Sequence, residues 1–490
     1  MLVSLYTSRL VLKALGETDL GIYNLVGSIV TLMAFLHSAQ TKATSRFITY
    51  ELGKSSDVSN PPKVFALCMT IHILISFVIL VIAETVGLAI INLWTDIPPE
   101  RQLAANCVYQ LSIMTFVVHF IRVPFDSVII AHEEMSIYAY MSILEVILQL
   151  VLVLVLQNLG GDKLVYYGAL LLFVAALLSF FYGGYVRLKH SEYKYKWTWD
   201  KKESFKILSF SGWTMLGSTS NTITQQGVSI LFNNFVGLVA NTALGFAQQV
   251  NTAVGRFVSS FTTAFNPQII KLYAEGNTSA MFMLMNRASK FSFFLCYIMA
   301  LPLILNMNFL LNLWLGSVPQ YAVVFCQLIV VCTVIDATTG VFNMAITATG
   351  NVRNYQIGIS ISFLLDFMCA GVLLKMDIHP AFVFGSRIIT RGLLNMLVGF
   401  HYSKKQMTFN LWKYMHEVIL PIILTLIFTI PVTLIASKSD TQWEQLVFST
   451  LAAVVSCILC LYFFILSTSE RAKLKEITIK KWNERFRSQL

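Results

Sequence analysis

The sequence predicts an all-α membrane protein with about fourteen transmembrane helices. Its 490 residues are 56% hydrophobic and only 12% charged, and that charged fraction is about half the value typical of a soluble domain. Fourteen apolar segments are long enough, or nearly long enough, to span a bilayer, and the connections between them leave no room for a domain outside the membrane. The high hydrophobicity also excludes an intrinsically disordered chain.

The apolar segments follow one another with short polar breaks. The first is short, because about fifteen helical residues reach about 22 Å, whereas the hydrocarbon core is about 30 Å thick. The first six segments are 1–14, 21–48, 64–93, 104–130, 136–157 and 164–186. The remaining eight are 207–233, 238–265, 288–314, 320–346, 354–374, 379–400, 414–436 and 443–467.

The distribution of Lys and Arg predicts the orientation, because basic residues are retained on the cytoplasmic side. With the N-terminus inside, the cytoplasmic connections and the tail carry 23 Lys and Arg residues, and the opposite side carries five. An even number of spans returns the C-terminus to the cytoplasm. Topology thereby explains most of the net charge of +10, so nucleic acid is not an expected partner. We expect the basic tail to touch anionic lipid headgroups.

A weak internal repeat predicts two lobes. Leu20-Gly21 and Leu244-Gly245 each precede a small and polar stretch that ends in a base and then an acid. Parallel repeats of this kind are a transporter architecture. The predicted organisation is an N-terminal six-helix lobe (1–186), a basic cytoplasmic linker (187–206), a C-terminal six-helix lobe (207–400), two additional spans (401–467) and a basic cytoplasmic tail (468–490).

Seven basic residues fall inside predicted spans: Arg9, Lys42, Arg46, Arg122, Arg256, Arg387 and Arg391. Each costs at least about 2.5–3.5 kcal/mol at the centre of a lipid-facing helix, so we expect most of them to face a protein interior or a wet cavity. Snorkelling to the interface is the alternative for Lys42 and Arg122. The pairs Lys42/Arg46 and Arg387/Arg391 are like charges four residues apart, which share a helix face and repel. We therefore expect negatively charged groups, from protein carboxylates or from an anionic substrate, to neutralise these pairs.

The carboxylates within the spans are fewer than the bases: Glu84, Asp126, Glu145, Asp336 and Asp366. The excess of positive charge within the spans favours an anionic substrate, because arginine binds phosphate through bidentate hydrogen bonds. The alternative is a set of internal salt bridges that fix helix packing, such as Arg122 with Asp126. Asp336 opens the small and polar stretch DATTGVFNMAITATG (336–350), and we take Asp336 and Asp366 as candidates for ion coupling.

Several stretches resemble a known family. They are YTSRLVLKALGETDLGIYNLVG (6–27), ATSRF (43–47), QQGVSILFNNFVGLVANTALGFAQQV (225–250), FNPQIIKLYAEG (265–276) and ATGNVRNYQI (348–357). They resemble bacterial polysaccharide flippases of the Wzx type, in the multidrug/oligosaccharidyl-lipid/polysaccharide exporter (MOP) superfamily. The resemblance covers nearly the whole chain, and its motifs are structural rather than catalytic.

The resemblance implies a pair of six-helix lobes around a central cavity, with two extra C-terminal helices. It implies a transporter of the bacterial inner membrane that flips undecaprenyl-pyrophosphate-linked oligosaccharide to the periplasmic leaflet, for O-antigen, capsule or exopolysaccharide synthesis. Other polysaccharide assembly proteins are then expected partners. Basic residues on spans 1, 2 and 8 line the cavity of related lipid flippases, and Arg9, Arg46 and Arg256 hold comparable positions here. With Arg387 and Arg391 they form the predicted substrate site.

Two other functions stay open. A cation-coupled multidrug exporter of the same superfamily would need acid in its cavity, whereas the first span carries Arg9 and no acid. A membrane glycan polymerase would need a sizeable periplasmic loop, and the predicted outer connections are short. The sequence predicts no enzyme and no cofactor. It also predicts no metal site, because His132-Glu133-Glu134 lacks the H-E-x-x-H spacing of a zinc motif. The eight scattered cysteines form no disulfide framework.

Overall fold

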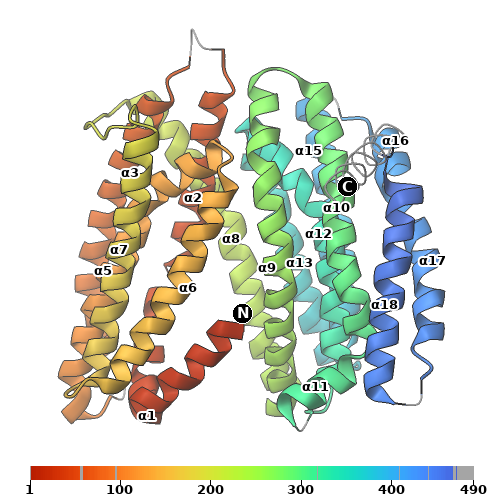
Figure 1. The fold of residues 1–490 in the computed structure, drawn as a ribbon, viewed down its shortest axis with the longest axis horizontal. Coiled ribbons are helices and arrows are strands. Elements are labelled where there is room, and N and C mark those ends of the chain that lie inside the picture. Colours follow the sequence, from red (N-terminus) through yellow and green to blue (C-terminus); the bar gives the residue numbers. More distant parts are fainter. Residues whose placement is uncertain are drawn as a thin grey trace, which may run out of the picture. The chain divides into compact units, whose positions relative to one another are not determined.

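The computed structural model of the protein describes residues 2–31, 33–55, 59–93, 97–316, 318–407, 409–439, 441–466 and 471. Every regular element in these ranges is a helix, and no strand occurs among them (Figure 1). The all-α prediction is confirmed.

The chain forms two compact units, and each is described by itself. The first unit comprises Met1–Ser220, Asn266–Asn277 and Thr347–Ile357, and the second comprises Asn221–Phe265, Thr278–Ile346 and Gly358–Leu490. Four helices, α8, α9, α12 and α13, contribute residues to both units.

The first eight α-helices are mostly or wholly in the first unit. They are α1 (Leu2–Thr31), α2 (Ala34–Leu52), α3 (Pro61–Ile82), α4 (Leu88–Leu93), α5 (Gln102–Ala131), α6 (Met135–Asn158), α7 (Lys163–Lys189) and α8 (Lys201–Phe235). A π-helical turn, Ala83–Gly87, joins α3 to α4, and a 3₁₀ turn, Pro99–Arg101, precedes α5.

The other ten α-helices are mostly or wholly in the second unit. They are α9 (Leu238–Ala274), α10 (Thr278–Leu305), α11 (Met307–Leu315), α12 (Ala322–Thr349), α13 (Arg353–Lys375), α14 (Phe382–Arg387), α15 (Leu394–Met407), α16 (Leu411–Tyr414), α17 (Leu420–Ala436) and α18 (Gln442–Cys460). Three π-helical segments, Ile388–Leu393, Met415–Ile419 and Leu461–Ile465, continue helices of this unit.

Hydropathy and length identify the membrane-crossing helices. Within the described ranges, nine helical stretches are long and apolar enough to cross a bilayer. The long helices α8 and α9 are not among them, because polar residues such as those of STSNTITQQG (218–227) lower their hydropathy. The total of fourteen spans stays a prediction.

A glycine separates the first two predicted spans. Helical hydrogen bonding continues through α1, but Gly16 has φ +79° and ψ 175°, so two helical arms meet there at a kink. Only glycine adopts this backbone conformation without strain. The first arm ends close to the predicted boundary at residue 14. The predicted second span, 21–48, is divided again, because α1 ends at Thr31 and α2 begins at Ala34.

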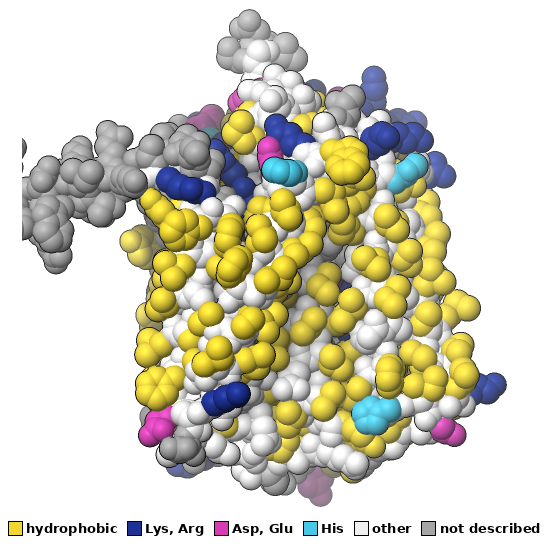
Figure 2. Space-filling model, turned by 90° about the vertical axis from the view of Figure 1, so that its right-hand side faces the viewer, with side chains coloured by type: hydrophobic (Ala, Val, Ile, Leu, Met, Phe, Trp, Pro, Cys, Tyr) yellow, Lys and Arg dark blue, Asp and Glu magenta, His cyan; other side chains and the backbone are white. Residues whose placement is uncertain are grey.

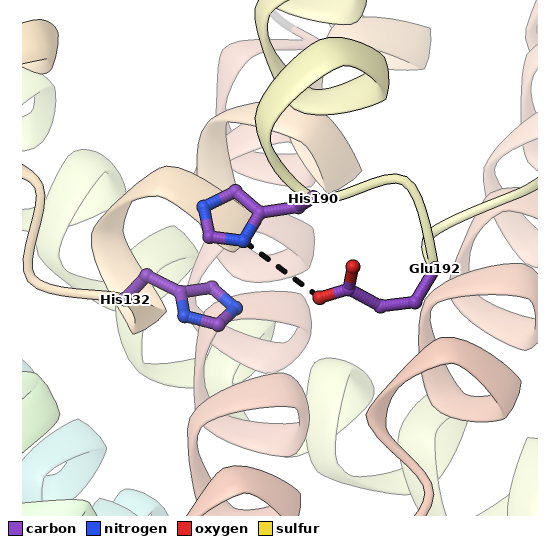
Figure 3. Close-up of side chains that lie close together, drawn as sticks. All are labelled: His132, His190 and Glu192. Atoms are coloured by element: carbon purple, nitrogen blue, oxygen red, sulfur yellow. Dashed lines mark ion pairs between the residues drawn. The ribbon is translucent and has the colours of Figure 1, made fainter.

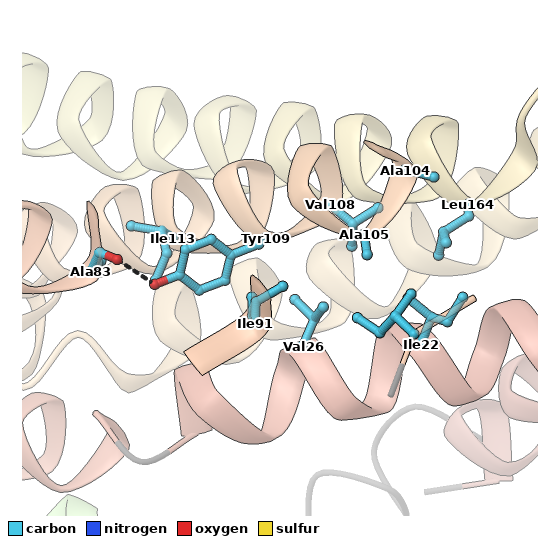
Figure 4. Packing of buried hydrophobic residues seen from close by; sticks show 11 residues of the cluster. Ile22, Val26, Ala83, Ile91, Ala104, Ala105, Val108, Tyr109, Ile113 and Leu164 are labelled. Atoms are coloured by element: carbon cyan, nitrogen blue, oxygen red, sulfur yellow. Dashed lines mark hydrogen bonds between the residues drawn. The ribbon is translucent and has the colours of Figure 1, made fainter. Parts of the chain in front are cut away.

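An apolar cluster in the first unit joins α1, α4, α5 and the start of α7 (Figure 4). Tyr109 is fully buried there, and its hydroxyl donates a 2.8 Å hydrogen bond to the carbonyl oxygen of Ala83. A Cβ at Gly87 would collide with that hydroxyl. Glycine within the π-helical turn therefore makes room for a buried tyrosine whose polar atom is satisfied.

Exposed hydrophobic side chains are also numerous on α17 and α18 of the second unit. Figure 2 shows them across the middle of one face of the molecule, while Lys and Arg gather mainly at one end. On α17 and α18 the exposed residues include Ile427, Phe428, Ile435, Leu451 and Val455, each more than half exposed. An apolar surface of this size is expected to face lipid.

Candidate functional site

A cavity of 1070 Å³ lies within the first unit. The C-terminal half of α2, the first turns of α3 and α8 and the turn between α12 and α13 surround it. Its charged lining consists of five bases and three acids: Arg46, Lys54, Lys63, Lys206 and Arg353 with Glu51, Asp200 and Glu203. The lining therefore carries two more positive than negative charges.

Each lysine of the cavity is paired with one of the acids. The pairs are Lys54–Glu51 (2.6 Å), Lys206–Glu203 (2.6 Å) and Lys63–Asp200 (3.5 Å). Asp200 also caps α8, accepting hydrogen bonds from the amides of Lys202 and Glu203 at 3.1 and 3.2 Å. The bond from the Glu203 amide is the main reason why the pKa of Asp200 lies below its ordinary value. The acids of the cavity are thus occupied by its lysines.

Arg46 lines the cavity and is 6% exposed. Its Nη2 donates to the carbonyl oxygen of Ala348 at 3.1 Å. The guanidinium carbon lies 4.4 Å from the ring centre of Tyr50 and 4.6 Å from that of Phe47. Its Nε is buried and has no hydrogen-bond partner, and no carboxylate in the described ranges forms an ion pair with it.

Arg353 is the second arginine of the cavity. It is exposed, and its guanidinium carbon lies 5.0 Å from the ring of Trp213. Within the described part of the chain it also has no ion-pair partner. The two excess charges of the cavity therefore reside on two arginines that lie against aromatic rings. Arginines of this kind retain N–H donors for an anion.

Gly350 allows the turn after α12 to approach Arg46. Its φ is +78°, a conformation that favours glycine. A Cβ at this position would lie 2.6 Å from Nη2 of Arg46. A side chain at residue 350 would therefore have to displace the guanidinium that the Ala348 carbonyl holds.

A second cluster of charges lies within the second unit. Arg387, Arg391 and Asp336 line one small gap, which is too narrow for water. Arg391 is 8% exposed, and its Nη2 donates to Oδ1 of Asn221 at 2.7 Å. Its guanidinium carbon lies 4.6 Å from the ring of Phe363. The Nε and Nη1 atoms of Arg391, and Nε of Arg387, are buried without partners.

The two candidate coupling acids differ in their surroundings. Asp366 is 3% exposed and accepts a 3.1 Å hydrogen bond from the hydroxyl of Thr390, which follows Arg387 on the same helical run. Asp336 is exposed. Both carboxylates are close enough to act electrostatically on Arg391. Of the predicted site residues, the structure thus brings Arg387, Arg391, Asp336 and Asp366 together in one unit.

The remaining predicted residues lie elsewhere. Arg46 belongs to the cavity of the first unit, and Arg256 is an exposed residue of α9 in the second unit. Arg9 lies in α1, and its side chain falls outside the described residues. That these residues bind substrate stays a prediction.

One predicted salt bridge is confirmed. Arg122 Nε lies 3.3 Å from Oδ2 of Asp126, four residues further along α5, and its guanidinium lies 4.8 Å from the ring of Tyr182. This base is neutralised within its own helix. For Arg122 the packing interpretation therefore holds.

Sequence reasoning missed three residues of these sites. Tyr50 lies four residues after Arg46, so helical spacing alone could have placed it on the same face. Arg353 lies in the motif ATGNVRNYQI (348–357), but its neighbour Trp213 lies 140 positions earlier in the chain. Asn221 is 170 positions from Arg391. No pattern within one helix indicates contacts of that kind.

Comparisons with known proteins show the family of the chain. The model of the family described as polysaccharide biosynthesis protein matches residues 1–273, which is more than half of the chain. Among curated proteins, no sequence matches. The match includes α1 to α9 and therefore most of the lining of the cavity around Arg46.

Solved structures of transporters share the fold. A MATE mutant is 12% identical with a TM-score of 0.74, covering 83% of this chain and 93% of its own. An outward-facing MATE family multidrug resistance transporter of the MOP superfamily is 14% identical, with a TM-score of 0.71 and coverages of 83% and 91%. A MOP superfamily transporter from Pyrococcus furiosus, whose reversed pocket polarity suggests a different function, is 15% identical, with a TM-score of 0.70 and coverages of 83% and 92%.

Proposed function

The chain belongs to the polysaccharide biosynthesis protein family of MOP-superfamily transporters, and from this premise we propose that it flips a lipid-linked oligosaccharide. The passenger would be an undecaprenyl-pyrophosphate-linked oligosaccharide, moved from the cytoplasmic to the periplasmic leaflet of a bacterial inner membrane by alternating access. Both termini would be cytoplasmic. The product would feed synthesis of a surface polysaccharide, together with other assembly proteins.

The cavity around Arg46 is the observation that carries this proposal. Its two excess positive charges reside on Arg46 and Arg353, neither of which has a carboxylate partner in the described ranges. A pyrophosphate diester carries one negative charge on each phosphate, so the charges match. Tyr50, Phe210 and Trp213 add aromatic surface for the apolar faces of sugar rings.

The second cluster supplies a second binding region for the headgroup. Arg387 and Arg391 hold unpartnered N–H donors inside the second unit. A buried cation without a carboxylate partner is costly, and the cost is offset when an anion arrives. Arg9 and Arg256 complete the proposed set. Asp366, which is buried beside these arginines, is the proposed coupling acid, with Asp336 as its exposed neighbour.

The membrane potential favours the proposed direction. The cell interior is negative, and each elementary charge that crosses is worth about 2.3 kcal/mol per 100 mV. The electrical free energy of an anionic headgroup therefore falls as it moves outward across the membrane. If Asp366 couples a cation in addition, flipping in proteoliposomes should respond to a proton or sodium gradient, and Asp366→Asn should abolish that response.

Leaflet-specific detection of the lipid-linked oligosaccharide tests the function. Cells depleted of the protein should accumulate it on the cytoplasmic side, and the wild-type gene should reverse the accumulation. The Arg46→Gln/Arg353→Gln and Arg387→Ala/Arg391→Ala double variants should fail to do so at equal protein abundance. Arg101→Gln, which removes an arginine outside both clusters, is the matched control and should restore export.

The outcomes separate function from site. Rescue by both double variants would keep the flippase and discard these arginines. Unchanged leaflet distribution and unchanged surface glycan on depletion would discard the flippase. Drug resistance on overexpression would then favour the cation-coupled multidrug exporter, the function that shares this fold.

A further inference from the structure

Two histidines and a glutamate converge at the ends of α5 and α7 in the first unit (Figure 3). His132 follows the last residue of α5, His190 follows the last residue of α7, and Glu192 lies in the connection to α8. One ligand atom from each residue lies within 4.8 Å of the other two. No metal motif is visible in the sequence, because the two histidines are 58 positions apart.

The hydrogen bonds of His190 determine which of its nitrogens is free. Its Nε2 lies 3.2 Å from Oε1 of Glu134, and a carboxylate can only accept, so Nε2 carries the proton. Glu134 is itself held by Lys189 at 2.6 Å and by the hydroxyl of Tyr185 at 2.9 Å. When the His190 ring is neutral, its lone pair is therefore on Nδ1.

That lone pair faces a second acceptor. Nδ1 of His190 lies 3.7 Å from Oε1 of Glu192, which is too long for a hydrogen bond. Two acceptors that face each other repel unless a cation lies between them, and either a second proton on His190 or a metal ion can be that cation. Around zinc, ligand atoms at about 2.0–2.2 Å from the metal are about 3.4 Å apart. The observed separation is close to that value.

The ring of His132 lies beside this pair. Its Nε2 lies 3.0 Å from the hydroxyl of Tyr193, and its ring stacks on His190 with 4.1 Å between centroids. A metal ligand must be a neutral imidazole. The nearby lysines are neutralised, Lys189 by Glu134 and Lys271 by Glu133 at 2.7 Å.

We propose that His132, His190 and Glu192 form a binding site for a divalent first-row metal ion of the zinc type. Two imidazole nitrogens, one carboxylate oxygen and a water molecule are a known zinc ligand set. Binding would draw the ligand atoms inward by up to about 1.4 Å from a widest separation of 4.8 Å to reach that tetrahedral spacing. The Glu192 side chain, which is 51% exposed, is free to make most of this adjustment. Glu134 orients the ring of His190, and Tyr193 orients the ring of His132, each through a hydrogen bond to a ring nitrogen.

The ion would fix the start of the connection between α7 and α8 to the end of α5. The same connection leads to Asp200, which lines the cavity around Arg46. The metal would thus brace one wall of that cavity. This consequence concerns positioning, and the metal site itself does not depend on the transported substrate.

Metal titration of the full-length protein tests the site. The protein is purified with an affinity tag that contains no histidine, reconstituted in lipid nanodiscs, stripped with a chelator and titrated with Zn²⁺ by calorimetry and with Co²⁺ by visible absorbance. We expect one ion per chain. His190→Ala should abolish binding, Glu192→Gln should weaken it at least tenfold, and Glu134→Gln should weaken it about 10- to 100-fold. His401→Ala, at an exposed histidine of α15, is the matched control and should bind normally.

Two results would overturn the proposal. One is the absence of stoichiometric binding by the wild type. The other is binding that survives in both His190→Ala and Glu192→Gln, since the ion would then be held elsewhere. Limited trypsin digestion adds an independent readout, because the ion should slow cleavage after the exposed Lys194 and Lys196 of the connection. Glu192→Gln changes an exposed side chain and should leave the fold intact.

Discussion

Replacement of Arg391 by Met separates a functional charge from a structural one. The substitution keeps most of the side-chain volume and removes the guanidinium. The direct contacts that are lost are the hydrogen bond to Asn221, about 1.5–3 kcal/mol for a charged donor, and the contact with Phe363, about 0.5–2 kcal/mol, and the attraction to Asp336 and Asp366 is lost with them. Asn221 still accepts a 3.3 Å hydrogen bond from Gln225.

What is gained is of similar size. Burial of an ion costs several kcal/mol, and the unpartnered Nε and Nη1 add about 1–3 kcal/mol each. We therefore expect the free energy of unfolding of Arg391→Met to lie within about 2 kcal/mol of the wild type, while export of the lipid-linked oligosaccharide is lost. Thermal unfolding in nanodiscs and the leaflet assay measure the two quantities.

Arg101→Met is the matched control. Arg101 joins Asp19 of α1 to Asp162 before α7, at 2.6 and 2.8 Å, and is 29% exposed. Its loss should lower stability by about 1–2 kcal/mol, because two well-formed but partly exposed ion pairs disappear, and it should leave export intact. If Arg391→Met instead lost more than about 3 kcal/mol, as when a buried ion pair is broken, or exported normally, the reasoning would be refuted.

Three further predictions concern local structure and pH. Gly87→Ala should destabilise the protein by about 1–3 kcal/mol, because its Cβ meets the Tyr109 hydroxyl, and adding Tyr109→Phe should restore part of the loss in thermal unfolding. Gly350→Ala should cost about 1–2 kcal/mol from its positive φ and should displace Arg46, so binding of a pyrophosphate lipid should weaken while Gly276→Ala, at another positive φ, leaves binding unchanged. Burial acts to raise the pKa of Asp162, but hydrogen bonds and charge from its arginine partner outweigh it and lower the pKa below the ordinary 3.8. That stabilisation is present above about pH 4 and is lost as the pH falls through the lowered value, so an acid titration of Asp162→Asn should show a shallower loss of stability than the wild type.

Hydropathy predicted the helices well where they are apolar throughout. The segments 136–157 and 164–186 correspond to α6, Met135–Asn158, and α7, Lys163–Lys189. Prediction was poorer for α8, which begins at Lys201 rather than at residue 207. The sequence KKESFK is polar, so a hydropathy window excludes it although its residues form helical hydrogen bonds.

The candidate sites were only partly predictable. Periodicity placed Arg387 and Arg391 on one face, and the structure keeps them together. It also paired Lys42 with Arg46, yet Lys42 is exposed while Arg46 is buried against a carbonyl 302 positions away. Which of two like charges is buried depends on the neighbouring elements, here the turn after α12. Family membership was predicted from loose motifs, and the family model matches residues 1–273, which contain most of them.

The π-helical segments have a consequence for the evolution of the chain. Each segment holds an inserted residue, so its hydrogen bonds join residues five apart rather than four. If one residue is removed there, the segment can form the hydrogen bonds of a regular α-helix. Elsewhere in a membrane helix a one-residue deletion rotates everything beyond it by about 100°. Within Ile388–Leu393 it would also turn Arg391 relative to Arg387. Alignments of relatives should therefore show single-residue gaps more often at Ala83–Gly87 and Met415–Ile419 than at Ile388–Leu393. At Ile388–Leu393 the inserted residue determines the direction of the Arg391 side chain relative to Arg387.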